Sequence, residues 1–174
     1  MKKAILTIVI ILLSNFNLLK AQEAKLKIGI ATDISFPVKD DIRFLYRIGY
    51  GGSLKVLRNI NKNGELTFTA TYLKLQNKDI PNAYGDKFDM IHLLAGYRYN
   101  FKGFYAEPQV GYSLYQARNK LINYNNSKNL LAWAIGLGYE FKSFDVSARY
   151  QFGHLRSDVM SFAAVRLGYN FSIN

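Results

Sequence analysis

The chain has 174 residues, with 23 Lys and Arg against 12 Asp and Glu, no Cys, and a formal net charge of +11. The lack of Cys excludes a disulfide framework, a thiolate metal site and a lipid-modified N-terminal cysteine. The length predicts one domain. The basic balance favours anionic lipid headgroups as partners, or Lys and Arg that simply cover turns and loops, over nucleic acid.

Residues 1–21 have the pattern of a secretory signal peptide. Lys2 and Lys3 form its positive region, residues 4–13 are apolar, and residues 19–21 fit a cleavage site before Gln22. The apolar run is too short to span a bilayer as a helix. The sequence therefore predicts an exported protein whose mature part is residues 22–174.

Eight segments of the mature part alternate large apolar residues with small or polar ones, which is the period of a β-strand. They cover residues 25–36, 44–56, 65–72, 91–101, 104–114, 131–141, 144–152 and 163–171. A soluble β-protein rarely buries a strand face that carries ions, whereas a barrel in a membrane turns that face towards its lumen. We therefore predict an all-β fold, an eight-stranded antiparallel up-and-down transmembrane β-barrel.

The alternation assigns two sets of residues to the two faces. The outward aromatic set is predicted to form girdles at the lipid–water interfaces: Phe101, Phe104, Tyr112, Trp133, Tyr139, Phe141, Phe144 and Phe152. The inward polar set is predicted to form a network in the lumen: Arg47, Lys55, Arg98, Glu107, Gln109, Glu140, Asp145, Arg149 and Arg166. Because an eight-stranded barrel is only wide enough for side chains to fill, this network favours a plug, with a narrow channel as the alternative.

The connections differ between the two ends of the predicted barrel. Two-residue turns are expected at residues 102–103 and 142–143, with a somewhat longer turn at residues 58–64 on the same end. Longer polar loops are expected on the other end, at residues 37–41, 77–87, 118–129 and 154–158. This asymmetry is typical of outer-membrane barrels.

The two-residue turns also predict the strand register. The first turn sets Arg98 opposite Glu107, an inward pair of opposite charge. The second sets Glu140 opposite Asp145, so this pair of carboxylates needs a cation from elsewhere. Pro108 lacks a ladder donor in mid-strand, and a bulge or kink is expected there.

At this point the mature chain resembles the small eight-stranded outer-membrane barrels of Gram-negative bacteria, the OmpA/OmpX-like and porin-family group. The resemblance rests on the exported precursor, on residues 104–112 and on the terminal strand. Arg166, Gly168, Tyr169 and Phe171 match the terminal pattern that the assembly machinery reads in this group, although three further residues follow here. The resemblance implies an outer-membrane location and contact with membrane lipid or lipopolysaccharide.

Three functions are compatible with this reading. The preferred one is a monomeric, non-enzymatic barrel without cofactor, with a structural role or a surface contact through the basic, Asn-rich residues 118–129. The second is a narrow channel for ions or small solutes. The third is a lipid A-modifying enzyme, because His154, Ser157 and Asp158 share a loop, but their spacing does not match the deacylase His-x-Ser motif. His92 faces inward without a spaced partner, so no metal site is predicted.

Overall fold

The computed structural model describes residues 26–39, 43–44, 46–78, 87–119, 124–155 and 158–173. The predicted signal peptide, residues 1–21, lies outside these described residues. Within them, no helix combines the length and the apolar character that crossing a membrane requires.

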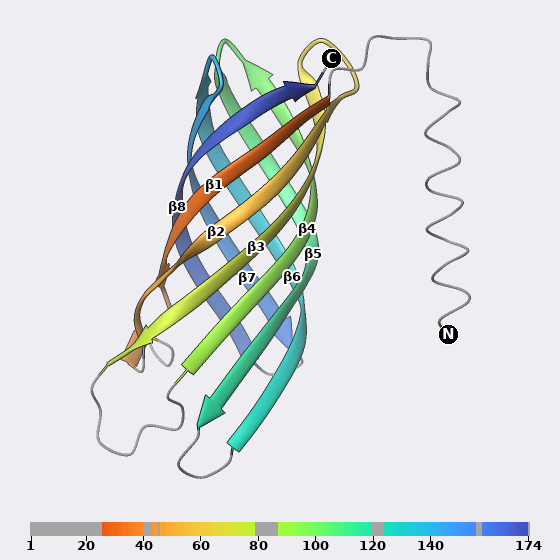
Figure 1. The fold of residues 1–174 in the computed structure, drawn as a ribbon. Coiled ribbons are helices and arrows are strands. Elements are labelled where there is room, and N and C mark those ends of the chain that lie inside the picture. The colour runs from red at the N-terminus through yellow and green to blue at the C-terminus, as the bar shows by residue number, and fades with distance from the viewer. Residues whose placement is uncertain are drawn as a thin grey trace.

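Eight antiparallel strands close into a barrel in which each strand pairs with its neighbours in sequence and the last pairs with the first (Figure 1). The fold class predicted from the sequence is thus confirmed. The strands are β1 (Leu26–Pro37), β2 (Tyr46–Asn59), β3 (Gly64–Asn77), β4 (Lys87–Phe101), β5 (Phe104–Asn119), β6 (Tyr124–Phe141), β7 (Phe144–Leu155) and β8 (Asp158–Ile173).

Two tight turns fix the register at one end of the barrel, which we call the turn end. Lys102 and Gly103 both have positive φ, 51° and 91°, the backbone that matches the twist of the flanking strands. Phe101 therefore pairs with Phe104, as expected from the sequence. The β4–β5 ladder is interrupted opposite Pro108 but has the same register on both sides, so the proline breaks the ladder without a bulge.

At the opposite end, which we call the loop end, several strands run further than the sequence indicated. β5 continues to Asn119 and β6 begins at Tyr124, so most of the expected loop at residues 118–129 is an extended hairpin. β7 and β8 are likewise separated only by residues 156–157, where a loop over residues 154–158 was expected. The apolar alternation does not reach the loop-end parts of these strands, so the sequence assigned those parts to the loops.

A bulge at the start of β2 reverses the faces of its first residues. Tyr46 pairs with Asn77 and Gly49 with Leu75, so three steps along β2 match two along β3. Tyr46 is consequently buried, at 7% exposure, and Arg47 is exposed on the outside. The prediction that Arg47 belongs to the lumen is therefore wrong, because the bulge shifts its side chain to the other face.

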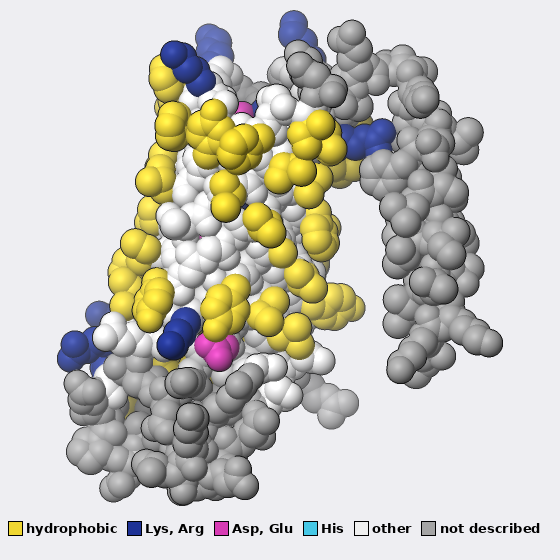
Figure 2. All heavy atoms as spheres, viewed as in Figure 1, with side chains coloured by type: hydrophobic (Ala, Val, Ile, Leu, Met, Phe, Trp, Pro, Cys, Tyr) yellow, Lys and Arg dark blue, Asp and Glu magenta, His cyan; other side chains and the backbone are white. Residues whose placement is uncertain are grey.

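The outer surface is apolar between charged ends. Figure 2 shows hydrophobic side chains along the height of the visible face, with Lys and Arg towards the two ends. All eight residues of the predicted aromatic girdles are exposed on this outer surface. At the turn end the rings also contact each other across strands, with centroids 4.8 Å apart for Phe104 and Tyr139 and 5.3 Å apart for Phe144 and Tyr169.

Two glycines on neighbouring strands differ in the space around them, and this difference is testable. A Cβ at Gly111 of β5 would overlap the carbonyl oxygen of Leu93, whereas a Cβ at Gly136 of β6 has its nearest neighbour at 3.7 Å. We expect Gly111→Ala to lower the free energy of unfolding by about 2 kcal/mol through steric strain. Gly136→Ala should stay within about 0.5 kcal/mol of the wild type.

Urea unfolding of both variants in the same detergent or lipid provides the measurement. Equal losses for Gly111→Ala and Gly136→Ala would contradict the backbone approach of β5 to β4 at Gly111.

Candidate functional site

The turn-end half of the lumen contains a polar layer of buried ion pairs. Within the part of the chain that the structure describes, these pairs join five acidic to five basic side chains, so their formal charges cancel. The acidic members are Asp33, Glu65, Glu107, Glu140 and Asp145, and the basic members are Lys27, Lys55, Arg98, Arg149 and Arg166. Buried charges persist only when they are paired in this way.

Arg98 lies at the centre of the polar layer, with no exposed surface. Its Nη2 is 3.0 Å from Glu107 Oε2 and 2.9 Å from Asp145 Oδ2, and its Nη1 is 2.9 Å from Glu140 Oε2. The ring of Tyr105 packs against the guanidinium group, with its centroid 3.6 Å from the Cζ atom of Arg98. Arg98 is therefore a cation that offsets the opposed carboxylates Glu140 and Asp145.

Glu107 is the most densely bonded carboxylate of the layer. Lys55 Nζ donates to both of its oxygens, at 3.0 and 2.9 Å, and Arg98 Nε donates to Oε2 at 3.0 Å. Thr67 Oγ1 and Gln109 Nε2 donate to Oε1 at 2.9 and 2.8 Å. With 3% of its surface exposed, Glu107 depends on these donors instead of water.

A second group of ion pairs crosses the seam between the first and last strands. Arg166 Nε of β8 donates to Asp33 Oδ1 of β1 at 2.9 Å, and Ser53 Oγ donates to Asp33 Oδ2 at 2.7 Å. Arg149 Nη2 lies 3.6 Å from the same carboxylate. One buried acid thus serves two arginines and joins β1 to β7 and β8.

His92 lies between the ion pairs and the loop end of the lumen. Its Nδ1 is 2.6 Å from Ser113 Oγ and 2.8 Å from Gln151 Nε2. Among the described residues, no three His, Asp or Glu side chains are grouped as a metal site would require. His92 thus takes part in a hydrogen-bonded cluster with a hydroxyl and an amide.

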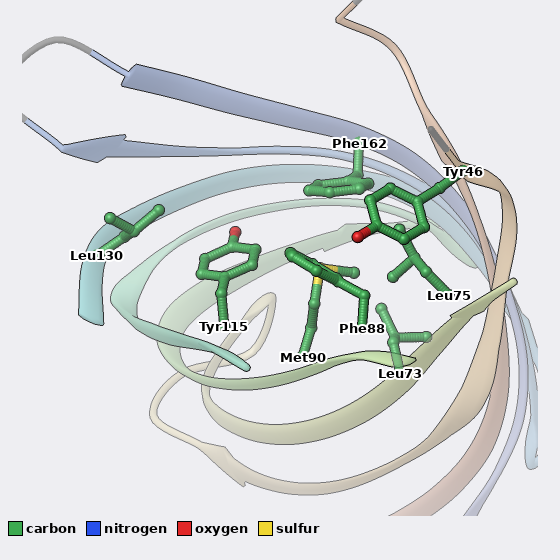
Figure 3. Packing of buried hydrophobic residues seen from close by; sticks show 8 residues of the cluster. All are labelled: Tyr46, Leu73, Leu75, Phe88, Met90, Tyr115, Leu130 and Phe162. Carbon is green, nitrogen blue, oxygen red and sulfur yellow. The ribbon is translucent and has the colours of Figure 1, made fainter. Parts of the chain in front are cut away.

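The loop-end half of the lumen is filled by an apolar layer that the sequence did not reveal. Figure 3 shows its side chains pointing towards one another from strands on different sides of the barrel. Its members are Tyr46, Leu73, Leu75, Phe88, Met90, Tyr115, Leu130 and Phe162. Ring contacts tie it together, with centroids 4.9 Å apart for Tyr46 and Phe88 and 6.0 Å apart for Phe88 and Tyr115.

The inward orientation of this layer follows from the alternation of each strand when that alternation is continued towards the loop end. Leu73 and Leu75 continue the inward positions of Thr69 and Thr71, and Met90 precedes inward His92 by two residues. These positions fall beyond the ends of the predicted strands, where apolar residues occur on both faces and the alternation is lost.

The polar layer holds a small cavity. A cavity of about 10 Å³ lies in the polar layer beside Lys55, Asp145, Arg166 and Asn170. That volume has room for about one water molecule. The bore at this level is therefore occupied by protein.

Eight of the nine residues predicted for the lumen lie in this network, and Arg47 does not. Those eight are Lys55, Arg98, Glu107, Gln109, Glu140, Asp145, Arg149 and Arg166. The prediction omitted Lys27, Asp33, Glu65 and Tyr105, which also contribute. Their inward phase is visible in the sequence, but which residues meet across the lumen depends on barrel closure.

The candidate assembly residues occupy both faces of β8. Arg166 is buried against Asp33, and a Cβ at Gly168 would come within 2.8 Å of Ala31. Tyr169 and Phe171 point outward, with ring centroids 4.7 Å apart.

The bonding of Glu107 yields a test with three variants. Glu107→Gln should lower the free energy of unfolding by about 3 kcal/mol, because it leaves the buried ammonium of Lys55 without its carboxylate. Adding Lys55→Met should recover part of that loss. Adding Arg98→Met should not, because Asp145 then loses the cation it pairs with and Glu140 keeps only Lys27.

The measurement is urea unfolding of the single and double variants in lipid or detergent. A larger recovery with Arg98→Met than with Lys55→Met would show that Glu107 depends chiefly on the arginine.

Comparison with known proteins agrees with this geometry. No family model matches the chain, and no curated protein matches it in sequence. Among solved structures, Ail of Yersinia pestis is 18% identical, with a TM-score of 0.63, over 86% of this chain and 100% of that one.

Two further structures are similar in the same way. Neisserial surface protein A (NspA) is 12% identical, with a TM-score of 0.61, over 87% of this chain and 100% of that one. The N-terminal β-barrel domain of Pseudomonas aeruginosa OprF is 16% identical, with a TM-score of 0.58, over 86% of this chain and 100% of that one. The chain therefore has the fold of the small eight-stranded outer-membrane β-barrels.

Proposed function

We propose that this protein is an integral outer-membrane β-barrel with a closed lumen, which acts as a monomer in a structural or surface-contact role. The outward apolar face and its aromatic girdles match what the hydrocarbon region and the two interfaces of a bilayer require. A closed barrel also leaves no strand edge exposed to lipid. The fold shared with Ail, NspA and OprF supports this location.

The observation that carries the proposal is the filled lumen. An ion crossing the barrel would have to displace the ion pairs around Arg98 and then pass the apolar layer, where it finds no hydration. Either layer alone would oppose conduction, and they are stacked along the same axis. The geometry therefore supports a plug over the narrow channel.

The ends of the barrel support contact with anionic lipid. Arg47, moved to the outside by the bulge, and Lys74 lie near the loop end on the outer surface. Cations at this level can attract the headgroups of membrane lipid or lipopolysaccharide. Ail, one of the similar structures, has also been solved with the heparin analogue sucrose octasulfate, a polyanion.

We propose no catalytic role. His154 and Asp158 lie in the β7 and β8 strands, and Ser157 lies outside the described residues. Lipid A mass spectra of cells with and without the protein should be identical, and a shifted mass would favour the enzyme alternative.

The proposed location and closed lumen are tested together on one preparation. The protein should be recovered in the outer-membrane fraction and migrate faster on gels when unboiled, as a folded barrel does. The same refolded barrel should then give no conductance steps in planar bilayers. The heat-dependent gel migration is the control for folding. A folded sample without conductance steps supports the plug, whereas regular conductance steps would support the channel. Recovery as a soluble periplasmic protein would contradict the proposal as a whole.

The terminal strand is proposed to be the segment that the assembly machinery recognises. Replacing both Tyr169 and Phe171 with Ala should leave unassembled protein that periplasmic proteases degrade. The chain offers a matched control, because Tyr139 and Phe141 occupy the same positions of the same Gly-Tyr-x-Phe pattern in β6. The measurement is the assembled fraction on unboiled gels. Equal assembly of the two double variants would show that the terminal pattern is not the signal.

A further inference from the structure

The outer surface of the barrel carries a trough where small residues face outward. Its floor lies over β1, β2 and β3, at Thr32, Gly52 and Ala70, and its volume is about 830 Å³. Two other hollows on the outer surface have volumes of about 490 and 350 Å³. Figure 2 shows white backbone at mid-height of the visible face, between hydrophobic side chains. We call this recess the outer trough.

The side chains that face the outer trough are apolar or already hydrogen-bonded. Phe144 and Tyr72 lie at its two ends, and Ile30 and Leu167 lie along it. The hydroxyl of Tyr72 donates to Asp89 at 3.0 Å, and that of Thr32 donates to a backbone carbonyl oxygen at 3.4 Å. A recess of this kind fits hydrocarbon and disfavours a polar ligand.

The strand register gives the direction of the outer trough. When paired residues are followed from Phe144 through Tyr169 and Ile30 around the barrel, the path returns to β7 at His154, ten residues nearer the loop end. Ten residues at ~3.3 Å, tilted by ~40°, rise about 25 Å along the barrel axis in eight steps. The trough crosses five of these steps, from β7 to Ile91 of β4. It therefore rises roughly 16 Å from the turn end.

This rise matches one leaflet of a bilayer. The hydrocarbon core is about 30 Å thick, so the outer trough covers about half of it, whereas a spanning helix would need the full thickness. The trough begins at Phe144 and Tyr169, whose rings form part of the aromatic contacts at the turn end. In barrels of this fold the short turns face the periplasm. The dimensions therefore fit an acyl chain of the periplasmic leaflet.

The charge of the turn end indicates the headgroup. Among the described residues, the exposed charged side chains at this end are Lys62, Lys102 and Lys142. The described acids of this end take part in the ion pairs of the lumen. Lys142 lies in the turn that leads into Phe144, at the mouth of the outer trough. Exposed Lys side chains at this level attract anionic headgroups.

We propose that the outer trough binds one acyl chain of an anionic phospholipid of the periplasmic leaflet, with the phosphate of that lipid at Lys142. This rests on the outer-membrane location proposed above and adds a lipid site to it. The site differs from the loop-end cations Arg47 and Lys74, which lie towards the other surface of the membrane.

The acyl-chain part is tested by filling the trough. The refolded full barrel in nonionic detergent is titrated with dipalmitoyl phosphatidylglycerol, and native mass spectra report the fraction that retains one lipid. Ala70→Phe should occupy the floor and weaken retention about tenfold. The control Ala106→Phe adds the same ring to the outer face of β5, between Tyr99 and Leu137 and away from the trough, and should change retention less than about twofold.

The headgroup part has a matched control in the second tight turn. Lys142 and Lys102 occupy the same position of their turns, with φ of 57° and 51°. Lys142→Gln should weaken retention about fivefold, and Lys102→Gln should change it less than about twofold. Phosphatidylethanolamine, whose net charge is zero, should bind the wild type about fivefold more weakly than phosphatidylglycerol.

A phosphatidylglycerol with a photoactivatable group in its acyl chain locates the site without a variant. Crosslinks should concentrate on β1, β2 and β3. Even labelling of all strands, equal retention of the two phospholipids, or Ala70→Phe that binds like the wild type would overturn the proposal. A lipid-free dimer in the mass spectra would assign the trough to a second copy and would also overturn it. Heat-dependent gel migration, measured alongside, reports the barrel itself, so a folded barrel that retains no lipid contradicts this inference alone.

Discussion

Arg98 is the side chain on which the polar half of the barrel depends. It comes from β4, yet its guanidinium group contacts carboxylates of β5, β6 and β7 and is covered by the ring of Tyr105. Its planar guanidinium, with five donors, contacts three carboxylates here, whereas the ammonium of Lys27 contacts two. The inward carboxylates of three strands therefore share this one cation, with Lys55 as a second cation on Glu107 and Lys27 on Glu140.

The two layers of the lumen fill the narrow interior of the barrel by different means. The polar layer pairs its charges through ion pairs and hydrogen bonds, and the apolar layer packs aromatic and aliphatic side chains against one another. Both follow from the small diameter of an eight-stranded barrel, whose interior must be filled by side chains from its own strands. The outer face, in contrast, is apolar on every strand, because each strand would contact the hydrocarbon of the bilayer.

The structural features that the sequence predicted are those that depend on residues close together along the chain. Strand number, the two-residue turns and the contact of Arg98 with Glu107 follow from alternation and turn length. The bulge that moves Arg47 outward could not be predicted, because it depends on the pairing of β2 with β3. The apolar layer lies where strands extend beyond their regular alternation, so single-strand patterns missed it. Pairs such as Asp33 and Arg166 lie 133 residues apart and meet only when the barrel closes.

That last pair has a consequence for the order of events during assembly. Asp33 and Arg166 sit on the strands that form the final seam, so a barrel that has not yet closed exposes both charges at its open edges. Such edges cannot remain in hydrocarbon, where unpaired backbone groups and ions are costly. We therefore expect closure and entry into the membrane to be coupled, and closure costs the entropy of bringing the two distant ends of the chain together.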